Sequence, residues 1–128
     1  MNKNDIEQYK AIGKISKEIR EYAQKIIKPG MLLVDIAKKI EEKIKEKGVE
    51  LAFPVNLSID DIAAHYHPLP DEKTVASGLL KVDIGIHKDG FIADNAITLD
   101  LSKNKEHTKI IAAAQKALDN ALELVKKN

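Results

Sequence analysis

The sequence predicts an α+β fold in which two amphipathic helices precede an antiparallel sheet and a third helix ends the chain. Apolar residues recur at three- and four-residue intervals in the first third of the chain and again after residue 108, which is typical of helices. Between them, short β-branched runs flank an Asp-Gly pair, which is typical of a hairpin. A length of 128 residues fits one domain, 1–128, and its core must be aliphatic because only 4% of the residues are aromatic.

The first helix is expected to end before Pro29. Asn4 with Glu7 has the spacing of a capping box and marks its expected start. Pro29 cannot continue the helical hydrogen bonds, and Gly30 permits the turn that follows. The apolar face contains Ile12, Ile15, Ile19, Ala23 and Ile26.

A second helix follows this turn directly, and Gly48 ends it. Its charged side, from Lys38 to Lys47, is interpreted as a solvated helix face. The apolar stripe on the other side contains Leu33, Ile36, Ala37, Ile40 and Ile44.

Strands are expected from residue 49 onward. The stretch Leu51–Ile59 contains Pro54, which indicates an edge strand or an irregular segment. Two longer runs, Leu79–Ile86 and Phe91–Leu99, flank Asp89-Gly90. Because both central residues of a type I′ turn need a positive φ, this pair is a strong hairpin signal.

The last helix resembles a second copy of the first. If Ile27 is laid over Val125, Ile12 falls on Ile110 and Ala23 falls on Ala121. Two explanations are open: the matches are a coincidence among aliphatic residues, or the chain is one unit of a duplicated architecture. The apolar residues at helical spacing are Ile110, Ala114, Ala117, Ala121 and Val125.

The hairpin brings two acidic residues to one face of the predicted sheet. With Asp89 and Gly90 as the loop, Asp83 faces Ala96 and Gly85 faces Asp94, so the two aspartates occupy diagonal positions on one face. Diagonal neighbours lie ~7–8 Å apart, and carboxylates at this separation could flank two divalent ions that are ~3.5–4 Å apart. The opposite face is the expected core, with Asn95 as its discordant member: Val82, Ile84, Ile86, Phe91, Ala93, Ile97 and Leu99.

A solvated sheet face is the alternative interpretation, with nearby lysines balancing the two acids. The small residues Gly85 and Ala96 favour a site, because they leave room for an ion or a substrate close to the backbone. The histidines add little by spacing alone. His65 and His67 lie in a loop and His87 lies near the turn, so a surface position explains each of them.

Composition excludes several classes of partner. A net charge of +1 provides no general attraction to nucleic acid or to an anionic membrane. The absence of cysteine excludes disulfides and thiolate metal sites. No apolar run approaches the ~20 residues of a membrane span, so we expect a soluble, cytoplasmic protein.

Three segments resemble methionine aminopeptidases. Residues 82–98 read VDIGIHKDGFIADNAIT, which is similar to the first metal-ligand hairpin of that family. Residues 52–59 read AFPVNLSI and residues 62–68 read IAAHYHP, which resemble the archaeal, type II branch. The similarity runs over essentially the whole chain but covers only the N-terminal half of a family member.

This resemblance implies half of a pita-bread fold, a curved antiparallel sheet with helices packed on one face. It also implies roles for individual residues. Asp83 and Asp94 match two aspartate metal ligands, His65 matches a catalytic histidine that contacts the substrate, and Phe53 matches a residue of the methionine pocket. The family's remaining ligands, one histidine and two glutamates, have no counterpart here, and Asn95 stands where threonine is usual.

The implied reaction is the metal-dependent removal of the N-terminal methionine from nascent polypeptides. The complete enzyme would use two divalent ions, Co, Mn, Fe or Zn, and the isolated chain is expected to bind metal weakly or in part and to be inactive or very weak. Its expected partners are peptides with an N-terminal Met and a complementary C-terminal half or a second copy. The alternative is a catalytically incompetent half-domain, natural or engineered, that serves as a structural or protein-binding module.

Overall fold

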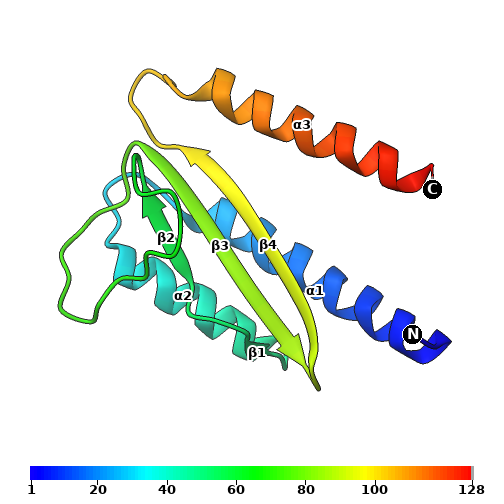
Figure 1. Cartoon of the computed structure of the whole chain (residues 1–128). Helices are drawn as coiled ribbons and strands as arrows, with labels where there is room; N and C mark the ends of the chain where they lie inside the picture. The colour runs from blue at the N-terminus through cyan, green and yellow to red at the C-terminus, as the bar shows by residue number, and fades with distance from the viewer. Residues whose placement is uncertain (128) are drawn as a thin grey trace.

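An antiparallel sheet of four strands forms the centre of the structure (Figure 1). In this computed structural model, which describes residues 1–127, β3 (Leu79–Lys88) pairs along its whole length with β4 (Phe91–Asp100). The other edge of β3 is shared by the short strands β1 (Glu50–Leu51) and β2 (Asn56–Ile59). The expected interruption at Pro54 is confirmed, because it lies between these two strands.

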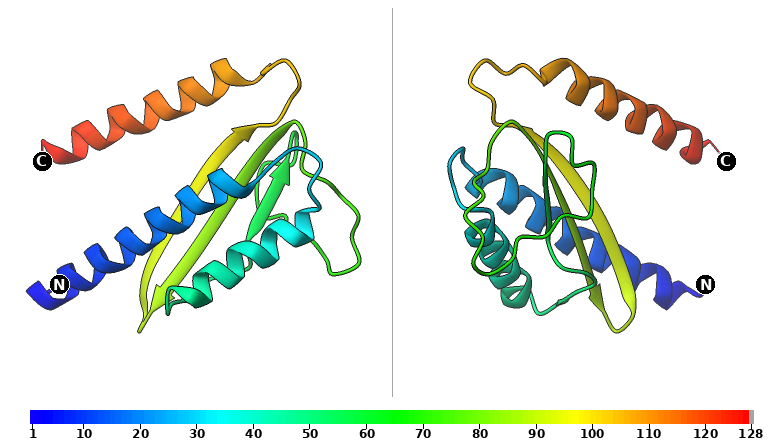
Figure 2. Two further views of the ribbon diagram at one scale, coloured as in Figure 1. Left: turned by 180° about the vertical axis from the view of Figure 1, so that it is seen from behind. Right: turned by 60° about the vertical axis from the view of Figure 1, so that its left-hand side comes forward.

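Two helices cover one face of the sheet (Figure 2). They are α1 (Lys3–Ile26), which lies mainly against β4 and also against β3, and α2 (Leu33–Glu46), which lies against β1 and β2; their apolar stripes share one core with the inward face of the sheet. The predicted aliphatic core is confirmed. Its largest fully buried side chains include Ile19, Leu33, Ile36, Ile40, Ile44, Leu57, Leu80, Ile84 and Ile86.

The start of α1 differs from the prediction. Asn2, not Asn4, is the N-cap, and its side chain accepts a 2.9 Å hydrogen bond from the backbone N–H of Asp5. Asp5 completes the capping box by accepting from the N–H of Asn2 at 2.8 Å. The pair Asn4 and Glu7 has the same spacing, so the sequence pattern alone does not separate the two registers.

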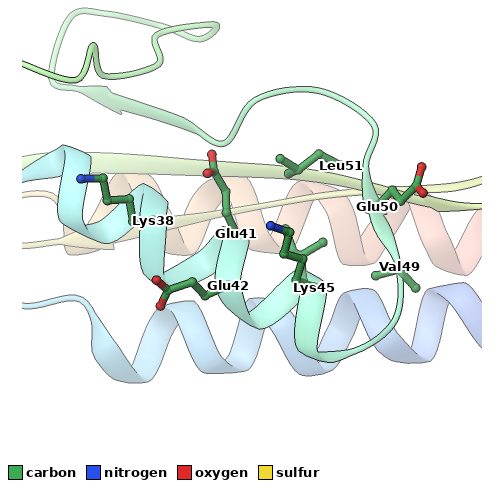
Figure 3. A pocket seen from close by; sticks show the side chains of 8 residues that line it. Lys38, Glu41, Glu42, Lys45, Val49, Glu50 and Leu51 are labelled. Carbon is green, nitrogen blue, oxygen red and sulfur yellow. The ribbon is translucent and has the colours of Figure 1, made fainter.

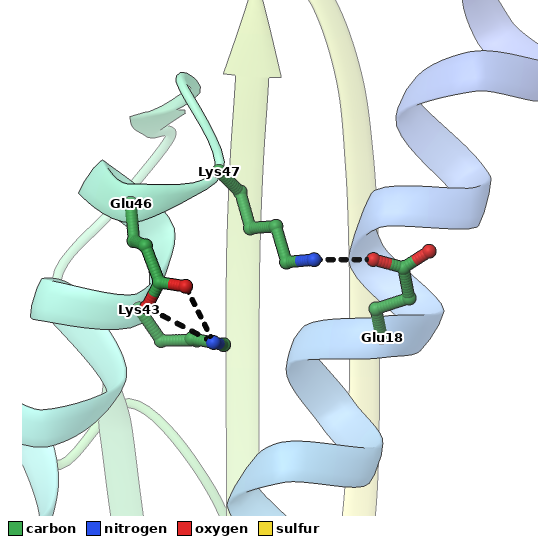
Figure 4. A network of polar contacts seen from close by, with 4 residues as sticks. All are labelled: Glu18, Lys43, Glu46 and Lys47. Atoms are coloured by element: carbon green, nitrogen blue, oxygen red, sulfur yellow. Dashed lines mark hydrogen bonds and ion pairs between the residues drawn. The ribbon is translucent and has the colours of Figure 1, made fainter.

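The outer surfaces of α1 and α2 are linked by charged side chains (Figure 4). Lys47 donates to Glu18 at 2.7 Å, and this hydrogen bond and charge lower the pKa of Glu18 and raise that of Lys47. Lys43 donates to Glu46 at 2.9 Å within α2. Because these groups are solvated, the two ion pairs contribute little to the stability of the fold.

A polar contact crosses the core between α1 and β4. Asn95, the discordant residue of the apolar face, accepts a 3.2 Å hydrogen bond from the guanidinium group of Arg20. Both side chains are partly buried. The amide is therefore satisfied by a residue 75 positions away.

Helix α3 (Thr108–Lys126) lies apart from α1 and α2 (Figure 1). Its main contact is with β4, and the described part of the helix contains no buried residue. Leu118 is 53% exposed and Val125 is 71% exposed, so the apolar stripe predicted for this helix faces solvent. Among residues 1–127, no helix is both long enough and apolar enough to cross a lipid bilayer.

Replacement of Arg20 by methionine should destabilise the chain, because it leaves the Asn95 amide on an apolar face without its donor. We expect the free energy of unfolding to fall by about 1–3 kcal/mol, measured by urea denaturation. The double variant Arg20→Met with Asn95→Val should recover most of this loss. Equal destabilisation by the single and the double variant would contradict the role assigned to this hydrogen bond.

Candidate functional site

The hairpin register places Asp83 and Asp94 on the same face of the sheet. Asp83 pairs with Ala96 and Gly85 pairs with Asp94, as predicted. Asp89 and Gly90 have φ values of 51° and 84°, which are the positive angles that a type I′ turn needs. The two aspartates project away from α1 and α2, because Val82, Ile84 and Ile86 fill the core side of β3.

The two aspartates of this face differ in exposure, since Asp94 is exposed and Asp83 is partly buried. Within residues 1–127, neither aspartate forms an ion pair with a lysine or an arginine. Lys81 shares the face, but its ammonium group donates to the backbone carbonyl of Asp60 at 2.6 Å. Within the described residues, Lys81 therefore forms no ion pair with either acid.

The pKa of Asp83 is raised above its ordinary value. Burial is the largest cause, and the charge and hydrogen-bond contact of Asp94 raise it further, whereas His65 and the N–H of Ile84 lower it less. Because the pKa of Asp83 is higher in the folded chain than in the unfolded chain, protonated Asp83 favours folding. This contribution to stability is fully present at a pH below the unfolded-state pKa and is lost as the pH rises through the folded-state pKa. Near neutral pH, ionised Asp83 therefore carries a cost that a nearby cation would relieve.

Gly85 pairs with Asp94 and lies two residues after Asp83, and the space above it holds the ring of Phe53 and not an open site for an ion. A Cβ atom at this position would overlap the ring of Phe53, which lies against the Gly85 backbone. Phe53 follows β1, and its neighbour Ala52 donates to the carbonyl of Gly85 at 2.9 Å. The structure thus brings Phe53 to the face of the sheet that holds Asp83 and Asp94.

His65 lies in the loop between β2 and β3, close enough to Asp83 for its charge to affect the pKa of that carboxyl group. The side chain is exposed, and its backbone has a φ of 65°, in the left-handed region. A non-glycine residue in this conformation is uncommon, although histidine is one of the residues that adopt it more often. His67 is exposed, as expected for a surface histidine. His87 lies 3.4 Å from Glu50 on β1, so it has a specific neighbour that the sequence did not predict.

Strand β2 adds residues beside Asp83 that sequence reasoning missed. Asn56 pairs with Asp83 across the sheet and is buried, and its amide donates to the carbonyl of Pro54 at 2.6 Å. Ser58 is buried two positions further along β2. Polar residues at alternate positions of a strand signal a non-core face, but their burial has no local sequence signal.

The donor set suits a hard or borderline divalent cation. Two carboxylates of like charge lie on one face beside the small residues Gly85 and Ala96, and oxygen ligands of this kind favour ions such as Mn²⁺. Residues 1–127 contain no group of three or more His, Cys, Asp and Glu side chains that could hold a metal ion. Asp83 and Asp94 alone would therefore supply only part of the coordination sphere of a metal ion.

A separate groove lies between α2 and β1 (Figure 3). It is lined by charged side chains that include Lys38, Glu41, Lys45 and Glu50, together with the apolar residues Val49 and Leu51. None of the aspartates or histidines of the candidate site lines this groove. It is therefore distinct from the face that holds Asp83 and Asp94.

Replacement of Gly85 by alanine should destabilise the chain by about 1–3 kcal/mol, because the new methyl group overlaps the Phe53 ring. The measurement is urea denaturation. Gly13→Ala is the matched control, since nothing lies within 4 Å of a Cβ there, and alanine in the helix should stabilise by roughly 0.5–1 kcal/mol. The double variant Gly85→Ala with Phe53→Ala should relieve the overlap between the new methyl group and the ring. Unchanged stability of Gly85→Ala would show that Phe53 does not rest on this glycine.

Comparison with known proteins shows the family of the chain. Metallopeptidase family M24 matches residues 7–128. The methionine aminopeptidase of Pyrococcus abyssi (strain GE5 / Orsay) is 45% identical over 124 residues, which cover 95% of this chain and 41% of the relative. The methionine aminopeptidase of Methanothermus fervidus is 38% identical over 134 residues, covering 94% of this chain and 71% of the relative.

The fold has a solved neighbour. The prolidase from Pyrococcus horikoshii OT3 superposes with a TM-score of 0.71 at 24% identity, covering 91% of this chain and 35% of the prolidase. This match confirms the expected α+β arrangement, half of a pita-bread fold, although α3 does not join the helices that cover the sheet. The chain spans about two fifths of the length of the Pyrococcus abyssi relative. With its motifs, its fold and these relatives, the chain belongs to metallopeptidase family M24.

Proposed function

We propose that this chain provides the N-terminal, aspartate-bearing half of a methionine aminopeptidase, a cytoplasmic enzyme that removes the initiator methionine from nascent polypeptides. The observation that supports this most directly is the pair Asp83 and Asp94 on one face, with no lysine or arginine paired to either within residues 1–127. In this proposal both carboxylates are metal ligands. Bound divalent ions, Co, Mn, Fe or Zn, would acidify a water molecule and polarise the peptide carbonyl.

The residues around the aspartates have complementary roles in the proposal. Phe53 provides an apolar surface beside Gly85, which suits the side chain of an N-terminal methionine. His65 is exposed close to Asp83 and can donate a hydrogen bond to a substrate carbonyl. Both residues lie on segments next to β1 and β2, so the sheet positions them relative to the aspartates.

The isolated chain should have little or no peptidase activity, because two carboxylates fill only part of the coordination sphere of either ion. The histidine and the two glutamates implied by the resemblance would come from a complementary C-terminal half. The alternative is a structural or protein-binding module that does not use metal. Metal binding distinguishes these two functions.

Calorimetric titration with Mn²⁺ or Co²⁺ tests the proposed site. We expect weak binding to the unmodified chain and a loss of affinity of at least about tenfold in Asp94→Asn, because the substitution removes one of the two charged ligands. Asp119→Asn is the matched control, since this acid lies on α3, where it accepts from Gln115 at 2.9 Å. No heat with either the unmodified chain or Asp94→Asn would favour the binding module.

The proposed partner surface is the apolar stripe of α3. Ile110, Leu118 and Leu122 are 61%, 53% and 48% exposed, and a contiguous apolar face of this kind favours association. In the proposal this stripe contacts the complementary half, and without that half it pairs with a second copy of the chain. A two-fold contact would use the same patch on both copies.

Sedimentation velocity at micromolar concentration tests this association. We expect the unmodified chain to sediment as a dimer and the double variant Leu118→Glu with Leu122→Glu to sediment as a monomer, because burial of unpaired charges opposes the contact. Lys116→Glu is the control, since it changes charge on the same helix without removing an apolar side chain. A monomeric unmodified chain would eliminate the second copy as a partner.

A further inference from the structure

The loop that contains His65 is held by a set of hydrogen bonds around Tyr66. The backbone carbonyl of Tyr66 accepts from the N–H of Leu57 on β2 at 2.7 Å. Its own N–H donates to the buried hydroxyl of Ser58 at 3.4 Å. The main chain next to His65 is therefore attached to the free edge of β2.

The side chain of Tyr66 makes a second attachment. Its hydroxyl donates to the carboxylate of Glu72, and its ring packs against the aliphatic core. Glu72 also accepts from the N–H of Leu69 at 3.0 Å and from the side chain of Thr74. Hydrogen bonds from Thr74, Tyr66 and Leu69 lower the pKa of Glu72, so Glu72 is ionised and accepts hydrogen bonds at neutral pH.

Glu72 is in turn fixed to the body of the fold by the segment 74–76. The carbonyl of Thr74 accepts from the N–H of Leu33 at 2.9 Å, at the start of α2. Ala76 exchanges two hydrogen bonds with the turn between α1 and α2, accepting from Gly30 at 2.8 Å and donating to Met31 at 2.7 Å. The Tyr66 hydroxyl is thus attached to the helices through Glu72 and residues 74–76, whereas the main chain of Tyr66 is attached to β2 of the sheet.

We propose that Tyr66 and Glu72 are positioning residues that hold His65 in its left-handed conformation beside Asp83. His65 has a φ of 65° and is exposed, so no packing of its own side chain explains this conformation. The attachments on its C-terminal neighbour supply the constraint instead. The inference builds on the role of His65 in the proposed function, and it assigns to Tyr66 and Glu72 no contact with substrate or metal.

Nuclear magnetic resonance of the whole chain tests this inference with three variants. In Tyr66→Phe and Glu72→Ala, amide hydrogen exchange at Leu57 and Leu69 should accelerate by about fivefold to tenfold, as expected for the loss of one hydrogen bond. The backbone couplings of His65 should shift from values for positive φ toward an average. Glu72→Gln keeps an acceptor oxygen and should retain most of the wild-type behaviour.

Two controls separate positioning from a general loss of structure. Tyr9→Phe removes a hydroxyl from a tyrosine that contacts Phe91 through its ring, and it should leave His65 unchanged. Exchange at the core amides of Val82 and Ile84 should stay slow in every variant. Unchanged couplings of His65 in both Tyr66→Phe and Glu72→Ala would overturn the inference.

Added Mn²⁺ distinguishes this inference from the proposed function. Paramagnetic broadening of the His65 ring signals in the unmodified chain, reduced in Tyr66→Phe, would support both. If Mn²⁺ causes no broadening at Asp83, Asp94 or His65, the proposed metal site fails. The couplings of His65 still decide the positioning role in that case, because they are measured without metal.

Discussion

The register of the β3–β4 hairpin is the constraint on which the candidate site depends. Side chains alternate between the two faces of a strand, so a slip of one residue would move Asp83 into the aliphatic core and Val82 into solvent. The Asp89-Gly90 turn sets this register with two positive φ angles, and the buried face of β3 reinforces it. Asp83 and Asp94 can share one face only because the apolar residues that alternate with them along the strands point to the opposite face and fill the core there.

That face is costly for the isolated fold. Asp83 is partly buried next to Asp94, and its raised pKa records the penalty of ionising it there. The open space left by Gly85 is filled by Phe53 and not by a compensating charge. An ionised, partly buried acid next to a second acid lowers stability, and functional residues commonly depart from the best choice for folding in this way.

Local patterns predicted most of the fold, whereas the contacts between distant segments were not predictable. The hairpin register and both core helices follow from spacing and turn chemistry within short windows. The partner of Asn95 was not visible because Arg20 lies 75 residues earlier, and the position of His65 depends on Tyr66 and Glu72 through a loop with no regular pattern. The cap of α1 was predicted two residues late, because Asn2 and Asn4 each precede an acidic residue at the same spacing.

The contact between α1 and β4 has a consequence for how the chain folds during synthesis. Helix α1 leaves the ribosome before β4, so Arg20 and the apolar residues beside it can contact β4 only after residue 95 has emerged. Until then α1 and α2 can pair with each other, but the sheet that covers them is missing. The hairpin closes quickly because its contacts are local, so docking of the early helices on it should be the slow, committing event.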